Sequence, residues 1–173
     1  MTPPTLTTAR LTLGPITPAH AGAFIAFCAT DASRFIGGPA DQRDAWEGAA
    51  ICAGLWALRG HGPFWVSNRD TGELLGRVGP YFPIWRSEPE LTWVIYPAHQ
   101  GNGFATEAAT AARAWCDAQG LAPMVSLINQ DNAASIRVAK RLGATCEAPH
   151  PLPDSDKIHR WRHPAPALAR GAA

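Results

Sequence analysis

The spacing of apolar and polar positions predicts a mixture of strands and helices. Near the N-terminus, Leu11 and Leu13 alternate with polar or small residues, which predicts an edge strand over residues 9–16. A helix capped by Thr17 is expected next, because a hydroxyl side chain directly before a helical segment accepts a bond from its first turn. A second helix is expected over about residues 42–59, before two glycines.

The period then changes to two residues. Segments 64–67 and 73–81 are predicted to form a hairpin around a turn at 68–72. Residues 91–96 form an apolar run rich in β-branched and aromatic side chains, which predicts a central strand that ends at Pro97.

The last third of the chain alternates helices with strands. The expected elements are a helix over 104–119, a strand over 124–128, a helix from 131 to 143, and strands near 144–147 and 157–162. We find no internal repeat and no linker. The pattern therefore predicts one α+β domain over residues 1–173, with a core at about 8–163 and a disordered tail at 164–173.

Composition narrows the classes of function. The chain has 173 residues, 15 Lys plus Arg, 14 Asp plus Glu and a net charge of +1, which gives no broad attraction for nucleic acid or an anionic membrane. No signal peptide and no apolar run of about 18 residues is present, so we expect a cytoplasmic protein. The four cysteines are far apart in sequence, which predicts reduced thiols and no metal site.

Two segments carry candidate chemistry. The predicted central strand runs through a turn with Gly101 and Gly103 directly into a helix. Such a turn directs several backbone N–H groups at one point, and the helix dipole adds partial positive charge, so it suits a pyrophosphate. An ordinary strand-to-helix turn is the alternative. Further on, Asn132 and Ser135 share one face at a helix start, either to bind a polar ligand or simply to cap the helix.

Together these segments resemble the GNAT (general N-acetyltransferase) superfamily. The loop matches its pattern as Gln100-x-x-Gly103-x-Ala105. The resemblance is greatest to the branch of bacterial enzymes that acetylate ribosomal-protein N-termini. That branch has three further features, found here as a Thr-x-Arg-Leu-x-Leu strand at 8–13, Thr-Glu-Ala at 106–108, and an Asn-x-x-Ser helix ending in Leu-Gly at 142–143.

The resemblance implies a three-layer fold. Its central sheet would be mixed but mostly antiparallel, with about six to seven strands, helices on both faces and splayed central strands. Acetyl-CoA would lie in the gap and react directly with a primary amine, either a protein N-terminus or a small molecule. The implied coenzyme contacts are Val94, Ile95, Gln100, Gly101, Asn102, Gly103, Phe104, Ala105, Thr106, Asn132, Ser135 and Lys140.

The resemblance also implies catalytic roles. Glu90 would be the base, with a pKa raised by burial, although a surface glutamate is the alternative and Glu88 the second choice. The backbone N–H of Val94 would stabilise the developing oxyanion. Ser135 would orient or protonate the departing thiolate, because neither tyrosine of the chain falls in the expected helix.

The acceptor cannot be assigned from the sequence. Residues in the region of the family's acceptor groove are Gly37, Gly38, Pro39, Trp46, Trp56, Tyr81, Phe82 and Trp85, and core packing explains each of them equally well. Dimers are common for this fold, so a homodimer is allowed. The competing hypotheses are a non-catalytic acyl-CoA sensor, a thiol hydrolase using Cys116, and an interaction module without a ligand.

Overall fold

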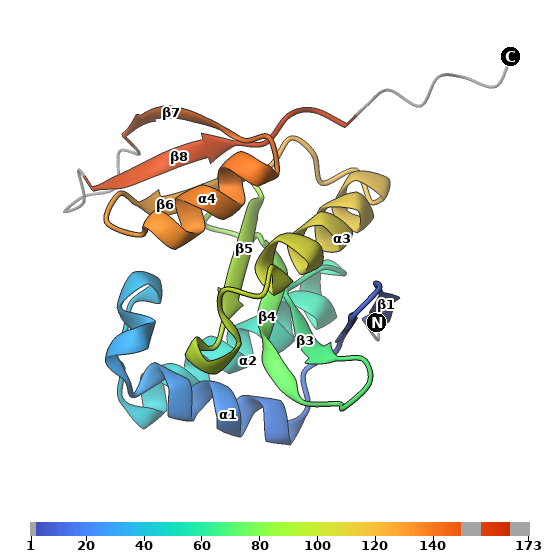
Figure 1. The fold of residues 1–173 in the computed structure, drawn as a ribbon, viewed down its shortest axis with the longest axis vertical. Helices are drawn as coiled ribbons and strands as arrows, with labels where there is room; N and C mark the ends of the chain where they lie inside the picture. The colour runs from blue at the N-terminus through green and yellow to red at the C-terminus, as the bar shows by residue number, and fades with distance from the viewer. Residues whose placement is uncertain (1–2, 150–156, 167–173) are drawn as a thin grey trace, which may run out of the picture.

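The structure, a computed structural model, describes residues 3–149 and 157–166. Its helices and strands alternate along the chain much as the apolar pattern predicts (Figure 1). In chain order the elements are β1 (Leu6–Thr7), β2 (Leu11–Gly14), α1 (Pro18–Cys28), η1 (Asp31–Ile36), α2 (Gln42–Arg59), β3 (Phe64–Asn68), β4 (Leu74–Tyr81), β5 (Glu90–Ile95), η2 (Pro97–His99), α3 (Phe104–Ala118), β6 (Val125–Asn129), α4 (Ala133–Arg141), β7 (Thr145–Pro149) and β8 (Ile158–Arg162).

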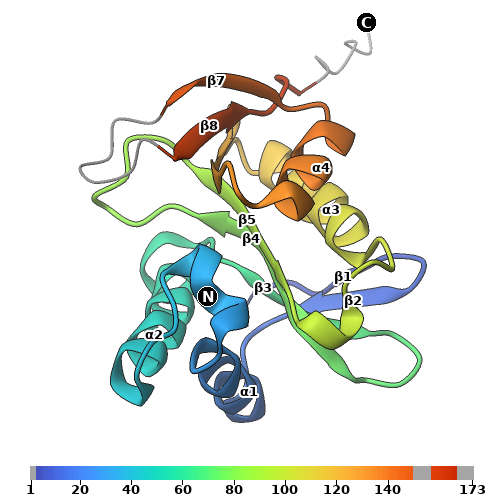
Figure 2. The same cartoon turned by 60° about the vertical axis from the view of Figure 1, so that its left-hand side comes forward.

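The strands form one sheet in the order β1-β2-β3-β4-β5-β6-β8-β7. All neighbours are antiparallel except β5 and β6, which run parallel. Helices α1 and α2 cover one face, and α3 and α4 cover the other (Figure 2). The mixed, mostly antiparallel sheet between two helical layers confirms the expected α+β class, and the two-residue β1 brings the strand number to 8.

Each face of the sheet has its own apolar cluster. Under α3, fully buried alanines pack against Leu75 and Leu91. Under α1 and α2, Phe24 meets Trp65 edge-on with ring centroids 5.6 Å apart. The small alanine side chains let α3 lie close to the sheet, so the start of this helix is held firmly at the end of β5.

The parallel pair at the centre of the sheet opens after one residue. Glu90 and Val125 are the one register pair between β5 and β6 in the described chain, followed by a bond from the Ser126 hydroxyl to the carbonyl of Leu91 (2.6 Å). Beyond this point the two strands separate. The structure therefore confirms the expected splay and places Glu90 where it opens.

The ends of several elements agree with the sequence signals. Helix α2 has the predicted range, with Asp41 as its N-cap and Gly60 in the left-handed region at its end. Thr17 caps α1 as expected. Most of the predicted tail, residues 167–173, lies outside the described residues. Within the described part of the chain, no helix combines the length and hydropathy needed to cross a bilayer.

Candidate active site

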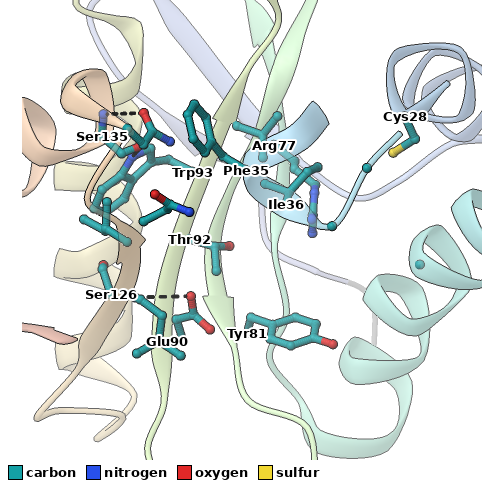
Figure 3. Close-up of a pocket in the computed structure, with 18 of the residues that line it drawn as sticks. Cys28, Phe35, Ile36, Arg77, Tyr81, Glu90, Thr92, Trp93, Ser126 and Ser135 are labelled. Atoms are coloured by element: carbon teal, nitrogen blue, oxygen red, sulfur yellow. Dashed lines mark hydrogen bonds between the residues drawn. The ribbon is translucent and has the colours of Figure 1, made fainter. Parts of the chain in front are cut away.

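A cavity of about 530 Å³ lies where β5 and β6 separate. On one side it reaches Asn132 and Ser135 of α4, and on the other it reaches α2 and the segment around η1 (Figure 3). Glu90 and Thr92 of β5 line it between these two sides. The cavity thus connects the two helical layers through the opening in the sheet.

Glu90 is a buried carboxylate in this cavity. Its side chain is 12% exposed, and its nearest cation is Arg86, with 3.9 Å between Nη2 and Oε2. The backbone N–H of Leu127 donates weakly to Oε1 at 3.5 Å. Burial raises the pKa of Glu90 to about 7, against the smaller opposing effects of Arg86, the Leu127 N–H and Arg77. A carboxyl group in this range can accept and release a proton near neutral pH.

The second-choice base, Glu88, has a different environment. Its carboxylate pairs with Arg160 at 3.2 Å and with Arg162 at 2.9 Å. It is not among the residues that line the cavity. Glu88 therefore serves as a structural ion-pair partner between the β4–β5 connection and β8.

Ser126 and His163 form a buried pair at the point where the strands separate. The serine Oγ lies 2.6 Å from the carbonyl of Leu91 and 2.9 Å from His163 Nε2. Because a carbonyl can only accept, the serine proton points to Leu91 and Nε2 must carry the histidine proton. Burial, with a smaller effect of Arg113, lowers the pKa of His163 to about 4, so the ring is neutral near pH 7 and carries its proton on Nε2.

The register of β5 corrects one prediction. The N–H of Tyr96 donates to the carbonyl of Leu75 on β4 at 2.8 Å, and the antiparallel register continues from there without a bulge. Bonded and non-bonded pairs alternate in such a ladder. The N–H of Val94 therefore faces β4, whereas the N–H groups of Trp93 and Ile95 face the gap. The prediction that Val94 presents its N–H to the gap is wrong, because the sequence does not fix the pairing.

The loop between β5 and α3 presents backbone N–H groups. Gly101 and Gly103 have φ values of 83° and 80°, in the left-handed region that favours glycine. The first bond within α3 runs from the Glu107 N–H to the Gly103 carbonyl (3.1 Å), so the N–H groups of residues 104–106 have no partner within the helix. Gly103, as N-cap, offers them no side-chain acceptor.

Polar side chains hold this loop in place. Gln100 Nε2 donates to the carbonyl of Ile95 at 2.8 Å, and the Asn102 amide donates to the carbonyls of His99 and Gln100. The Thr106 hydroxyl is buried without a partner among the described residues, so it can bond to a polar ligand at this end of β5.

The N-terminal segment clamps the same loop. Thr8 Oγ1 donates to Glu107 Oε1 at 2.6 Å, and Arg10 Nε donates to Oε2 at 2.8 Å. Arg10 also donates to the carbonyl of Asn102 (3.1 Å) and stacks over Phe104 at 4.6 Å. Burial would raise the pKa of Glu107, but the bonds from Thr8 and Arg10 outweigh it and lower that pKa.

The predicted residues of α4 divide into two groups. Asn132 Oδ1 accepts the backbone N–H of Ser135 at 3.1 Å, so it caps the helix while lining the cavity. Ser135 Oγ accepts a bond from Trp93 Nε1 at 3.1 Å and faces β5. Lys140 is exposed near the other end of α4 and does not line the cavity.

The aromatic residues predicted for the acceptor groove lie in different places. Tyr81 and the segment 37–39 line the cavity. Trp56 is 3% exposed in the core, where Nε1 donates to the carbonyl of Pro63, so core packing is the correct one of its two interpretations. Trp46 and Trp85 are exposed, and neither lines the cavity.

Sequence reasoning missed three contributors to the site. Arg77 is a charged residue within the otherwise apolar stretch 74–78, which is a usable signal. No sequence pattern indicates that Ser126 or the gap-facing N–H of Trp93 belongs to the site, because their positions depend on how the strands pair.

Cys116 is not placed as a nucleophile, and no metal centre is found in the part of the chain that the structure describes. Cys116 is fully buried on α3, and burial raises its pKa to about 12, which argues against a thiolate nucleophile. No group of three or more His, Cys, Asp and Glu side chains in residues 3–149 and 157–166 is arranged to hold a metal ion.

The chain is similar to solved and curated proteins. The acetyltransferase from Agrobacterium tumefaciens str. C58 is 34% identical with a TM-score of 0.87, over 94% of this chain and 95% of that one. Uncharacterized protein YkkB of Bacillus subtilis (strain 168) is 31% identical over 117 residues, which are 65% of this chain, and the chain spans 63% of the length of that relative. RimL, a ribosomal-protein alpha-N acetyltransferase solved in complex with coenzyme A, shares the fold, with a TM-score of 0.74 at 15% identity over 94% of this chain and 98% of that one.

A family model agrees with these similarities. The model of the acetyltransferase (GNAT) domain matches residues 10–145, which include the splayed strands, the glycine loop and the Asn132–Ser135 helix start. The chain therefore belongs to the GNAT acetyltransferase family, whose members use acetyl-CoA as the acetyl donor.

Proposed function

We propose that this protein transfers an acetyl group from acetyl-CoA to a primary amine by direct attack, with Glu90 as the base. The observation that carries the proposal is the buried carboxylate of Glu90, with a pKa of about 7, in the cavity at the opening of the splay. This position suits removal of a proton from an amine that reaches the gap from the α1–α2 side.

Two features of the chain fit the donor. The gap between β5 and β6 exposes the backbone of Trp93 and Ile95, which suits an amide-containing arm that pairs like an added strand. At the end of β5, the uncapped start of α3 and the loop 100–106 suit a pyrophosphate. When bound, the coenzyme supplies an activated thioester, and the protein supplies the positioning.

The catalytic steps follow from groups around the cavity. Glu90 accepts the proton of the acceptor ammonium, directly or through water. The N–H of Trp93 faces the gap and donates to the acyl oxygen as negative charge develops there. Ser135 accepts its bond from Trp93, so its hydroxyl can donate a hydrogen bond to the departing sulfur. The thiolate then takes up the second proton that the nitrogen loses as the amide forms. No acyl-enzyme is needed, because the amine and the thioester meet in one cavity.

The proposal is tested by turnover across pH with a panel of L-amino acids, their amides and short peptides, read by mass spectrometry of the acetylated product. We expect kcat/KM to rise with pH through about 7 for an accepted amine, because Glu90 must lose its proton to act. Glu90→Gln should reduce kcat by about 10²-fold or more and remove this rise.

Glu88→Gln is the matched control, since it makes the same change two residues away in an ion-pair cluster. It should keep both the rate and the pH profile. Acetyl-CoA binding without turnover on any amine would favour the sensor hypothesis instead. Equal effects of the two glutamine variants would reject Glu90 as the base.

A further inference from the structure

Arg77 is a cation inside the cavity without a carboxylate partner. It lies on β4, where Nη1 donates to Cys52 Sγ at 3.0 Å and the guanidinium stacks over Phe24 at 4.9 Å. Its Nε is buried with no partner among the described residues. Within residues 3–149 and 157–166, Arg77 forms no ion pair, unlike Arg86 beside Glu90.

Such an arrangement is costly without a ligand. A guanidinium carries five N–H donors, and neither a thiol nor an aromatic face satisfies them as a carboxylate does. Desolvating a charge without an opposite charge is unfavourable. An anionic group entering the cavity would therefore gain a charge-assisted bond at little additional desolvation cost.

Arg77 and Glu90 lie on the same face of the sheet. The register pairs Arg77 with Val94 and Tyr81 with Glu90, and residues two apart on a strand share a face. Four residues separate the two levels, about 13 Å along the strands, and both long side chains extend into the same cavity. The guanidinium of Arg77 is near enough to Glu90 to oppose the rise of its pKa, so the two side-chain groups are closer than their backbones, and one small acceptor can contact both with its amine at Glu90.

The remaining cavity wall supports a small anionic acceptor. Cys28, Cys52 and Gly48 are neutral and small, and Phe35 and Ile36 border the cavity from η1. Besides Glu90, the acidic residue on the wall of the described cavity is Asp44, which is exposed in the first turn of α2. The acceptor side of the cavity thus carries positive charge at Arg77 and at Arg86, and of these two cations only Arg86 pairs with Glu90.

We infer that the acceptor is a small amine that also carries a carboxylate, such as a free amino acid, and that Arg77 binds this carboxylate. The inference rests on the proposed acetyl transfer. It distinguishes a free amino acid from a peptide N-terminus, because the first carbonyl of a peptide is a neutral amide. Arg77 is then a specificity-determining residue that leaves the chemistry to Glu90.

The test compares each L-amino acid with its own amide under acetyl-CoA saturation. The α-amine of an amide loses its proton more readily, so intrinsic reactivity alone favours the amide. We expect the parent to prefer the free acid by at least about tenfold in kcat/KM, the scale of one charge-assisted bond. In Arg77→Met, the ratio of kcat/KM for each acid to that for its amide should fall by about 10²-fold, mainly through KM for the acid.

Arg43→Met is the control, since Arg43 is an exposed α2 arginine with an 85% exposed side chain, and it should behave as the parent. A parent that prefers amides or peptides, or an Arg77→Met enzyme that keeps the preference for acids, would overturn the inference. If circular dichroism shows that Arg77→Met does not fold, the inference is tested instead by the ratio of kcat/KM for acids to kcat/KM for amides, measured for the parent and for Arg77→Lys. Failure to bind acetyl-CoA or to acetylate any amine would reject the proposed function instead.

Discussion

Two titratable groups with opposite pKa shifts lie at the opening of the sheet. Glu90 has its pKa raised from 4.5 to about 7, so folding favours its protonated form, and this contribution to stability is lost as pH rises through 7. His163 has its pKa lowered from 6.5 to about 4, so folding favours its neutral form, and this contribution is lost as pH falls through 4. Between about pH 4.5 and pH 6.5, where both windows overlap, the two effects on the free energy of unfolding cancel.

Removing one of these two groups should reveal the pH dependence of stability that the other one causes. In Glu90→Gln, the unfolding free energy relative to the parent should increase by about 2 kcal/mol from pH 5 to pH 6.5, at about 1.4 kcal/mol per pH unit. Urea titrations at several pH values measure this difference. Glu88→Gln should show no such trend, and a pH-independent difference for Glu90→Gln would mean that Glu90 is not held protonated by burial.

The Ser126 hydroxyl should contribute measurably to stability. Ser126→Ala leaves the Leu91 carbonyl and the His163 Nε2–H without a partner in a buried place. Such a loss costs about 1–3 kcal/mol, which thermal or urea unfolding can detect. Unfolding free energy equal to that of the parent would show that water or a strand shift satisfies both groups.

At the scale of single residues, the sequence predicts the role of a residue when that role depends on its neighbours in the chain. Glu90 stands at the start of an apolar strand, so the sequence could suggest a buried carboxylate there, with a surface glutamate as the alternative. Val94 and Trp93 are adjacent in the same run, and the choice between their N–H groups depends on pairing with a strand fifteen or more residues away. Periodicity along one strand contains no such information.

Among the elements, the N-terminal segment has a role that its own pattern does not reveal. The Thr-x-Arg stretch at 8–10 appeared only as part of an edge strand and of the family resemblance. In the structure it bonds to Glu107 and to the carbonyl of Asn102, so it fixes the start of α3 and the loop before it. The Thr-x-Arg motif and the Thr-Glu-Ala motif, almost a hundred residues apart in the sequence, therefore contact each other directly.

Arg10→Ala should weaken donor binding more than it weakens the fold. The Arg10–Glu107 pair has an arginine side chain that is 49% exposed, so its loss should cost less than about 1 kcal/mol in unfolding free energy. Without the clamp the loop must be ordered on binding, and we expect the Kd for acetyl-CoA to rise by about tenfold. Calorimetric titration measures the Kd for acetyl-CoA, and urea unfolding measures the free energy of unfolding.

Arg43→Ala removes a comparable exposed pair with Glu47 on α2 and should change neither the Kd nor the unfolding free energy appreciably. A Kd for Arg10→Ala equal to that of the parent would show that the loop is ordered without its clamp.

The ranges of the helices were the easiest features to predict from the sequence, because caps such as Thr17 and Asp41 are local signals.

Across the whole molecule, function depends on a cavity that no single segment contains. Its lining comes from α1, η1 and the segment after it, α2, β4, β5, β6, α4 and β8, and it passes through the sheet where two parallel strands separate. The α+β class follows from the order of elements in the sequence. The cavity does not, because it depends on the packing of helices such as α2, which buries Trp56 in the core and leaves Trp46 exposed.

The distribution of thiols across the molecule gives a further test. Cys28, Cys52 and Cys116 are buried, and Cys146 is exposed. Brief treatment with iodoacetamide should add one group, at Cys146, and should leave acetyl-CoA-dependent turnover intact, as measured by mass spectrometry and product formation. Cys146→Ser should then gain no adduct. Loss of turnover in step with alkylation would revive the thiol hydrolase hypothesis.

The most direct measurement is calorimetric titration of acetyl-CoA into the parent, Gly103→Glu and Gly120→Glu. Both glycines have positive φ, 80° and 73°, and have room for a side chain, so the two variants carry the same charge change and similar backbone strain at opposite ends of α3. We predict micromolar binding by the parent and by Gly120→Glu, and none by a folded Gly103→Glu. Absence of binding by a folded parent, or equal binding by all three proteins, would contradict a coenzyme site at the start of α3.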